Sequence, residues 1–253
     1  MQLLLPHQRI GYCHAPCCAL RRNKTDTSEM VTQLVFGETF EVLSQADHWI
    51  EIQSLTDGYS GYVDRRHLIG LSEKEVQRWH DERRIALSFM QTVKSPWGNM
   101  CIPAGSYLGS NETFMLGKDR FECLDSSQHP KESLLSMMLN VPYLWGGKSS
   151  FGIDCSGLSQ LYFKSFGYNL PRDAKDQQSA GNLIDLQELR EDDLLFFQNP
   201  AGKITHVAIA LNAQEVIHAS GRVRKDRIDQ GDIWNDELQE ITHKFHSACR
   251  ILP

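Results

Sequence analysis

The hydrophobic and polar positions alternate in short stretches over the first part of the chain. VTQLVFGETFEVL and HWIEIQS each show partial two-residue periodicity, and Asp57-Gly58 marks a turn before YSGYV. No helical period is sustained in this stretch. Residues 1–70 are therefore predicted to form a small β-barrel.

A helix and a second group of strands are predicted after this barrel. Ser72 and Glu75 have the spacing of a capping box, and the charged sequence that follows predicts a connecting helix on the surface over residues 71–87. Residues 88–125 again show short apolar stretches separated by glycines. IPAGSYLGSNETFML partly repeats the pattern of LVFGETFEVLSQADHWI, which indicates a second small barrel.

The pattern changes after residue 125, where helices come before strands. Pro130 and ESLLSMMLN predict a helix that ends by Pro142, and a second helix is expected over 154–166 with Gly167 as its stop. DDLLFF, THVAIAL and EVIHAS then predict strands. Helices followed by a run of strands favour an α+β fold for residues 126–253.

Composition and charge exclude two classes of partner. The 253 residues have a net charge of −6 and no large cluster of lysine and arginine, so we expect no binding to nucleic acid. No stretch approaches the roughly 18 apolar residues of a membrane span, so no membrane association is expected. We expect a monomer.

The cysteines and the N-terminus bear on the compartment. Seven irregularly spaced cysteines cannot form a complete set of disulfides within one chain. The N-terminal MQLLLPHQRIG is too short in its apolar part for a secretory signal. Both features favour the cytoplasm; a periplasmic or secreted location would apply if a signal had been removed ahead of this sequence.

Two groups of potential metal ligands lack the further residues that a metal site needs. CHAPCC at residues 13–18 offers three thiols and His14, but no second cluster completes a zinc site. His243 and His246 have the spacing of a helical ligand pair without an accompanying carboxylate motif, so both are expected on the solvated surface. We predict no metal and no cofactor.

Cys155 begins the helix predicted over 154–166. Asp154 is a good N-cap residue, which puts the thiol in the first turn, at the positive end of the helix. An ordinary thiol and imidazole, with pKa values of ~8.5 and ~6.5, favour the neutral pair by about 2.7 kcal/mol, whereas a helix end contributes only ~0.3–1 kcal/mol. A histidine must therefore lie against the sulfur for a thiolate–imidazolium pair to exist in the resting protein.

Two histidines on neighbouring predicted strands could supply that base. His206 and His218 share a face of the sheet only if the pairing register is even, as with a three-residue loop centred on Ala213. A two-residue turn would send the second ring to the other face. With even register, His206 can act as the base while His218 orients it. Taken singly, Cys155 could equally be an apolar packing thiol.

At these residues the sequence resembles the NlpC family of bacterial cell-wall cysteine peptidases, whose fold is a reduced papain-like α+β core. The resemblance implies Cys155 as nucleophile, His206 as general base and His218 as its polar partner. Tyr143 would lie near the oxyanion position, with Trp145 close by in the loop before the helix. The matching segments, in the family's order, are PYLWGG (142–147), DCSGL (154–158), LPRDAKDQ (170–177), DDLLFF (192–197), THVAIAL (205–211) and VIHASG (216–221).

The N-terminal half resembles the SH3-like barrels that precede such catalytic domains, through TSEMVTQLVFGE and DGYSGYV. Members with these barrels cleave small peptides released from peptidoglycan, between γ-D-glutamate and the diamino acid, and require a free L-alanine amine. The resemblance places Glu29, Tyr59 and Asp173 around that amine. It places Asp154 and Ser156 around the D-glutamate.

One departure from this pattern is Ala174, which stands where such members often carry a serine and removes a possible hydrogen bond to the substrate. The expected function is a cysteine peptidase of murein peptide recycling, acting on L-Ala-γ-D-Glu-diamino acid peptides. Two alternatives stay open: acyl transfer by the same three residues, and a wall-fragment binding module with an idle thiol. The sequence leaves open whether lysine or diaminopimelate follows the glutamate.

Overall fold

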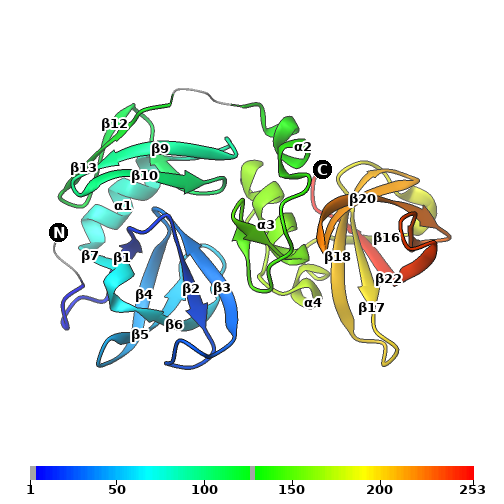
Figure 1. Ribbon diagram of the computed structural model, residues 1–253, viewed down its shortest axis with the longest axis horizontal. Helices are drawn as coiled ribbons and strands as arrows, with labels where there is room; N and C mark the ends of the chain where they lie inside the picture. The colour runs from blue at the N-terminus through cyan, green and yellow to red at the C-terminus, as the bar shows by residue number, and fades with distance from the viewer. Residues whose placement is uncertain (1–3, 126–128) are drawn as a thin grey trace.

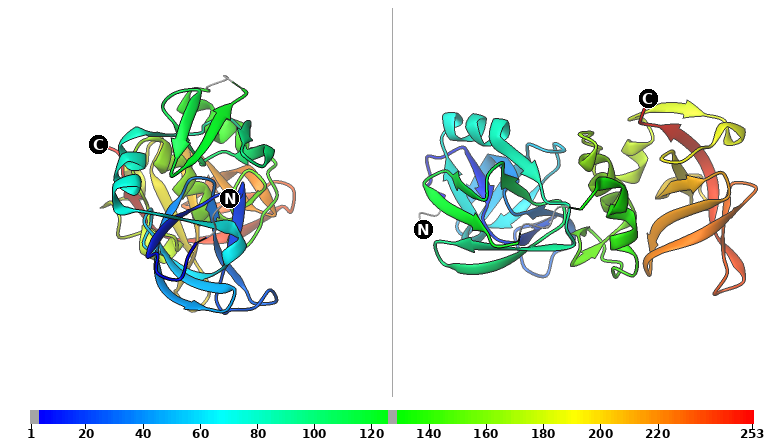
Figure 2. Two further views of the ribbon diagram at one scale, coloured as in Figure 1. Left: turned by 90° about the vertical axis from the view of Figure 1, so that its left-hand side faces the viewer. Right: turned by 90° about the horizontal axis from the view of Figure 1, so that it is seen from above.

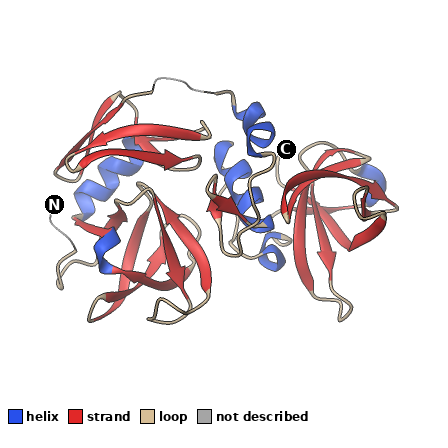
Figure 3. Cartoon of the chain, viewed as in Figure 1, coloured by secondary structure: helices blue, strands red, loops and turns tan. Residues whose placement is uncertain are grey.

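The computed structural model describes residues 4–125 and 129–253. Two β-rich regions lie at opposite ends of the molecule, and α2 (Leu134–Met138), α3 (Cys155–Ser165) and α4 (Ala174–Gln177) lie between them (Figure 1). The view from above in Figure 2 and the helix colouring of Figure 3 show the same order. The predicted domain boundary at residue 125 borders residues 126–128, which lie outside the described residues, as do residues 1–3.

The N-terminal strands form a seven-stranded sheet that curls into a small barrel, with the order β3-β2-β6-β5-β4-β1-β7. Alternate side chains along these strands, such as Ile50 and Ile52 on β5, are buried inside it. The strands are β1 (Ile10–Cys13), β2 (Cys17–Arg21), β3 (Met30–Val35), β4 (Thr39–Ala46), β5 (Trp49–Ser54), β6 (Ser60–Asp64) and β7 (Leu68–Leu71), with a 3-10 turn η1 (Arg65–His67) before the last.

The helix α1 (Glu73–Glu82) begins with the expected capping box between Ser72 and Glu75. Its charged face is exposed, as the sequence predicted, while its other face packs against the barrel. Val76 and Trp79 are buried, and the Trp79 indole N–H donates to the carbonyl of Gly37 at 2.8 Å. Two apolar residues one turn apart are enough to anchor this otherwise charged helix between the barrel and the strands that follow.

The strands after α1 share a hydrophobic core with the barrel and the helix. Phe36 of the barrel, Trp79 of α1 and Phe121 of β13 belong to one buried cluster. These strands form a four-stranded sheet, β10-β9-β13-β12, and a separate β11–β8 pair, so they do not copy the seven-stranded barrel strand for strand. The predicted domain limits stay a prediction. The strands are β8 (Arg83–Ile85), β9 (Met90–Ser95), β10 (Gly98–Pro103), β11 (Tyr107–Gly109), β12 (Thr113–Leu116) and β13 (Asp119–Cys123).

The C-terminal half packs α3 against a seven-stranded sheet with the order β16-β22-β17-β18-β19-β20-β21, which confirms the α+β prediction. Leu158 and Leu161 of α3 share a core with Val207 of β18. Gly167, with φ +88°, follows the end of α3 as predicted. The remaining elements are η2 (Lys131–Ser133), β14 (Lys148–Ser149), β15 (Gly152–Ile153), β16 (Asn182–Ile184), η3 (Leu186–Glu188), β17 (Leu194–Gln198), β18 (Ile204–Asn212), β19 (Glu215–Ser220), β20 (Arg222–Asp229), β21 (Asp232–Asn235) and β22 (Glu240–Arg250).

The β18–β19 hairpin reaches the required register by an unexpected route. Asn212 pairs with Glu215, so the turn has two residues and differs from the three-residue loop that would give an even register by itself. A register shift between Ala210 and Asn212 compensates, and Ile209 faces Ile217 in even register. A β-bulge adds one residue to one strand, and that extra residue reverses the parity set by the turn. No helix among the described residues is long and apolar enough to cross a membrane.

Candidate active site

The thiol of Cys155 lies at the start of α3, as the sequence predicted. The Asp154 carboxylate caps the helix by accepting from the backbone N–H of Gly157 at 2.8 Å. Cys155 is 8% exposed, and the backbone N–H of Val207 hydrogen-bonds its sulfur. Since Val207 directly follows His206, the sulfur lies against β18 beside that histidine.

The two predicted histidines lie together behind the thiol. Nε2 of His206 is 2.8 Å from Nδ1 of His218, and both side chains are buried. Nε2 of His218 lies 2.9 Å from Oδ2 of Asp226, a buried carboxylate on β20. Because Nε2 of His206 is hydrogen-bonded to His218, Nδ1 is the ring nitrogen of His206 that is available to the thiol.

His243 corrects the expectation of a solvated surface residue. It lies on the strand β22 and not on a helix, and its ring stacks on that of His206 with centroids 4.1 Å apart. Burial first, and the charge of His218 second, lower its pKa to about 4. His246, three residues on, is exposed as predicted.

The three histidines 206, 218 and 243 are the one group of three potential metal ligands found among the described residues, with ligand atoms within 4.8 Å of one another. The rings of His206 and His243 are stacked with an inclination of only 28°, so their lone pairs lie in two nearly parallel planes. The arrangement therefore suits packing and hydrogen bonding better than metal coordination.

The electrostatic surroundings favour neutral partners at rest. Burial first, and the Asp154 charge second, raise the pKa of Cys155 to about 11, although the Val207 N–H acts in the opposite direction. Burial, with the charges of His218 and His243, holds the pKa of His206 well below its usual value. Both shifts favour the neutral thiol and imidazole over a resting thiolate–imidazolium pair, because desolvation penalises both charged forms more than the helix end compensates. The arrangement suits general-base transfer of the thiol proton during attack.

Tyr143 lies at the mouth of the site, half-buried before α3. Burial, followed by the charges of Cys155 and Asp154, raises its pKa to about 12. The phenol is therefore protonated at neutral pH. It can donate a hydrogen bond to an oxygen that becomes negative near the sulfur.

Arg172 is a buried part of the site to which no pattern in the sequence drew attention, although it lies within LPRDAKDQ. Its guanidinium donates to both carboxylate oxygens of Asp154, at 3.1 and 2.6 Å, and to Oγ of Ser156 at 2.7 Å. Its Nε donates to Thr32 of the barrel at 2.8 Å. One arginine thus holds the helix cap and joins it to the barrel.

The thiol opens onto a cavity of about 360 Å³ between the catalytic half and the barrel. All of the predicted substrate contacts line it, whereas His206 and His218 lie behind its wall. Sequence patterns did not point to Arg22, Lys175 or Thr205, which also line it. The predicted residues in the lining are Glu29, Tyr59, Tyr143, Trp145, Asp154, Cys155, Ser156 and Asp173, with Ala174 beside them.

The barrel side of this cavity carries carboxylates that already have partners. Glu29 accepts from the indole N–H of Trp145 at 2.8 Å and from Nε of Arg22 at 2.7 Å. The hydrogen bond from Arg22 is the main cause that lowers the pKa of Glu29. The hydroxyl of Tyr59 donates to Asp173 at 3.2 Å.

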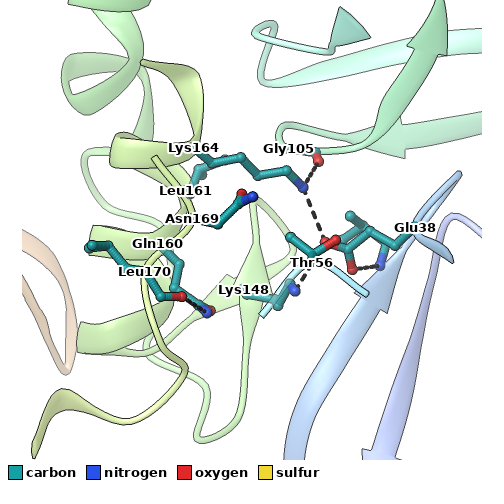
Figure 4. Close-up of a pocket in the computed structure, with 10 residues that line it drawn as sticks. Glu38, Thr56, Gly105, Lys148, Gln160, Leu161, Lys164, Asn169 and Leu170 are labelled. Atoms are coloured by element: carbon teal, nitrogen blue, oxygen red, sulfur yellow. Dashed lines mark hydrogen bonds and ion pairs between the residues drawn. The ribbon is translucent and has the colours of Figure 1, made fainter. Parts of the chain in front are cut away.

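A buried charge cluster fixes the barrel to the catalytic half (Figure 4). The fully buried Glu38 of the barrel lies 3.1 Å from Nζ of both Lys148 and Lys164, and Asp57 lies 3.6 Å from Lys148. Burial opposes ionisation of Glu38, yet the two lysines keep its pKa below the usual value. Lys164 also donates to the carbonyl of Gly105 at 2.8 Å. The barrel is therefore held in place beside the cavity.

Comparison with known proteins identifies both halves. Residues 140–243 match the family described as NlpC/P60, and residues 20–68 match the bacterial dipeptidyl-peptidase Sh3 domain. A gamma-D-glutamyl-L-lysine dipeptidyl-peptidase from Bacillus subtilis (strain 168) is 30% identical over 216 residues, which are 74% of this chain and 71% of that protein. The chain belongs to the NlpC/P60 family.

Other relatives agree with this placement. Dipeptidyl-peptidase 6 from Lysinibacillus sphaericus is 26% identical over 227 residues, 76% of this chain and 81% of that protein. The crystal structure of an NlpC/P60 protein from Bacillus cereus ATCC 10987 superposes with a TM-score of 0.79 over 96% of this chain and 100% of that one, and at 17% identity it shows the fold. The family resemblance and the papain-like fold with an SH3-like domain are confirmed. As a member of this NlpC/P60 family of cell-wall peptidases, the protein is a cysteine peptidase.

Proposed function

We propose that this protein hydrolyses the bond between γ-D-glutamate and the diamino acid in peptidoglycan stem peptides that begin with a free L-alanine. The observation that carries the proposal is that Glu29 and Tyr59 of the barrel line the same cavity as Cys155. A cationic amine held at the barrel side sets how many residues precede the bond at the sulfur. Asp154 and Ser156, beside the thiol, are assigned to the D-glutamate.

The proposed reaction uses three groups in sequence. The sulfur of Cys155 attacks the γ-carbonyl carbon while Nδ1 of His206 takes the thiol proton. The oxygen that becomes negative accepts from the Tyr143 hydroxyl and the backbone N–H of Cys155. His206 then gives its proton to the amine of the departing diamino acid, and a thioester of the L-Ala-γ-D-Glu part is left on the sulfur.

Hydrolysis of this thioester completes the cycle. Water attacks the thioester carbonyl while His206 takes a proton from the water, and the sulfur leaves as the C–S bond breaks. His206 returns that proton to the sulfur. If an amine took the place of water, the product would be a new amide, so the acyltransferase alternative differs only in this second step.

At the barrel side, the substrate ammonium would have to replace the guanidinium of Arg22 on Glu29. The methyl group of Ala174 cannot donate the hydrogen bond that a serine could, so Glu29, Tyr59 and Asp173 provide the polar contacts. We further propose that the protein acts as a monomer in the cytoplasm, in recycling of wall peptides. Its seven free cysteines support a reducing compartment.

The test compares Cys155→Ala with the wild type on L-Ala-γ-D-Glu-L-Lys, on the diaminopimelate analogue and on an N-acetylated peptide, with products identified by mass spectrometry. We expect about a 10⁴-fold or greater loss of turnover in Cys155→Ala, retained binding, and slow cleavage of the N-acetylated peptide by the wild type. Cys101→Ala, at an exposed cysteine of β10, is the matched control and should keep full activity.

Three results would contradict the proposal in different ways. Full turnover by Cys155→Ala would exclude Cys155 as the nucleophile. A wild type that binds the peptides without cleaving them would favour the wall-fragment binding module. Transfer products in the presence of added amines would favour the acyltransferase.

A further inference from the structure

We infer that Asp226 is a positioning residue that sets the tautomers of His218 and His206 and so leaves Nδ1 of His206 free to take the thiol proton. The inference rests on the proposed function for its consequence in catalysis. Asp226 lies on β20, two strands from His206, and touches only the second of the two histidines. No sequence motif singled it out.

The geometry forms a single chain of contacts. Oδ2 of Asp226 is 2.9 Å from Nε2 of His218, and Nδ1 of His218 is 2.8 Å from Nε2 of His206. Asp226 is 4% exposed and His218 is fully buried, so water does not compete for these positions. Each histidine thus has one ring nitrogen committed to the next group in the chain.

The charge of Asp226 is held by Arg224 on the same strand. Nε of Arg224 lies 2.8 Å from Oδ2 of Asp226, and Nη2 of Arg224 donates to Oδ1 of Asp226 at 2.9 Å. The far side of Arg224 pairs with Glu237 at 2.8 Å. The Asp226 carboxylate faces this guanidinium, and a carboxylate only accepts hydrogen bonds.

The tautomers follow from this starting point. Burial lowers the pKa values of both histidines, so each ring carries one proton at neutral pH. Since Asp226 only accepts, Nε2 of His218 carries the proton and Nδ1 of His218 is bare. That bare nitrogen accepts from Nε2–H of His206. His206 is then left with a bare Nδ1, the form that a general base for the thiol needs.

The opposite tautomer of His218 would leave His206 unable to act as a base. If His218 were protonated at Nδ1, it would donate to Nε2 of His206, and the single proton of His206 would sit on Nδ1. A His206 ring in that form cannot accept from the thiol. Asp226 therefore acts on the reaction through two rings without touching the sulfur.

The experiment uses the full chain with ¹⁵N-labelled histidine and records which ring nitrogens are protonated by two-bond ¹H–¹⁵N NMR. In the wild type we expect Nε2 protonated and Nδ1 bare on both rings. In Asp226→Asn the amide N–H₂ can face His218, so a population with reversed tautomers is expected. The kcat should fall about 100-fold or more, as when a carboxylate that fixes a tautomer is replaced, while KM changes little.

Two further variants separate this role from a structural one. Asp226→Glu keeps an acceptor-only group and should recover part of the kcat and the wild-type tautomers. Asp236→Asn removes an exposed carboxylate that pairs with Arg227 on the same sheet, and it should change neither measurement.

The inference is overturned if the wild-type spectrum shows Nδ1–H on His206, a result that does not depend on the folding of any variant. It is also overturned if folded Asp226→Asn keeps the wild-type tautomers and a kcat within about threefold of wild type. Failure of the proposed function looks different, since the wild type would then show the expected tautomers without cleaving the peptides.

Discussion

The two ends of the active-site cavity use the same kinds of side chain under opposite conditions. At the thiol, Asp154 and Arg172 form a pair that is almost fully buried. At the barrel side, Glu29 and Arg22 form a pair of similar length with exposed side chains. The buried pair cannot exchange its partners with water or ligand without a large penalty, whereas the exposed pair can.

This difference separates positioning from recognition. The buried groups near Cys155 form hydrogen bonds with a fixed direction. A reaction centre needs such fixed groups. At the barrel side, the exposed guanidinium of Arg22 occupies a position on Glu29 that the substrate ammonium can take instead. Burial, more than residue type, therefore decides which carboxylate keeps its partner and which one can exchange it for a charge of the substrate.

The largest effect is expected from breaking the buried pair. Arg172→Met leaves the Asp154 carboxylate buried without its guanidinium, and such a change costs about 3–5 kcal/mol of unfolding free energy. Urea unfolding monitored by circular dichroism measures it. Arg227→Met, at an exposed pair, is the control and should barely shift the midpoint. Equal midpoints for the two variants would mean that burial does not distinguish the pairs.

A second prediction sharpens the description of the thiol. Because the pKa of Cys155 is raised to about 11, the thiolate fraction grows with pH through the neutral range. The rate of iodoacetamide labelling at Cys155 should therefore rise about tenfold per pH unit between about pH 7 and 9. Mass spectrometry of the digested protein measures the rate, with the exposed Cys101 in the same digest as the reference for access. A flat profile would instead indicate a resting thiolate–imidazolium pair.

The smallest effect is expected at the exposed pair. Arg22→Gln removes the cation that competes with the substrate ammonium for Glu29, so KM for L-Ala-γ-D-Glu-diamino acid peptides should fall a few-fold with kcat unchanged. Steady-state kinetics measure both constants. Lys24→Gln removes the same charge two residues away and should leave KM as it is. A higher KM in Arg22→Gln would show that Arg22 helps to hold the substrate.

Local signals predicted the parts of the site that lie close together in the sequence. The cap at Asp154 and the helix that starts at Cys155 follow from neighbouring residues. His206 and His218 were expected to share a face only if the register was even, and the structure meets this condition through a two-residue turn and a bulge. The sequence pattern gives no sign of the bulge, which changes the parity of the pairing.

Arg172 and His243 come from distant parts of the sequence, and the local patterns did not place them in the site. Arg172 meets Asp154 across 18 positions and Thr32 across 140. His243 was expected on the solvated surface, yet β22 places its ring on that of His206. The pKa shift of the Cys155 thiol could not be predicted for a related reason, since burial depends on the whole fold and a pattern shows only neighbours along the chain.

The cluster of Glu38, Asp57, Lys148 and Lys164 has a consequence for any attempt to isolate the peptidase half. Its two positive members come from that half and its two negative members from the barrel. An excised catalytic fragment would expose a pair of unmatched ammonium groups, one of them only seven positions ahead of the nucleophile. The barrel thus supplies the counterions of Lys148 and Lys164, and a fragment intended to keep these ion pairs has to include it.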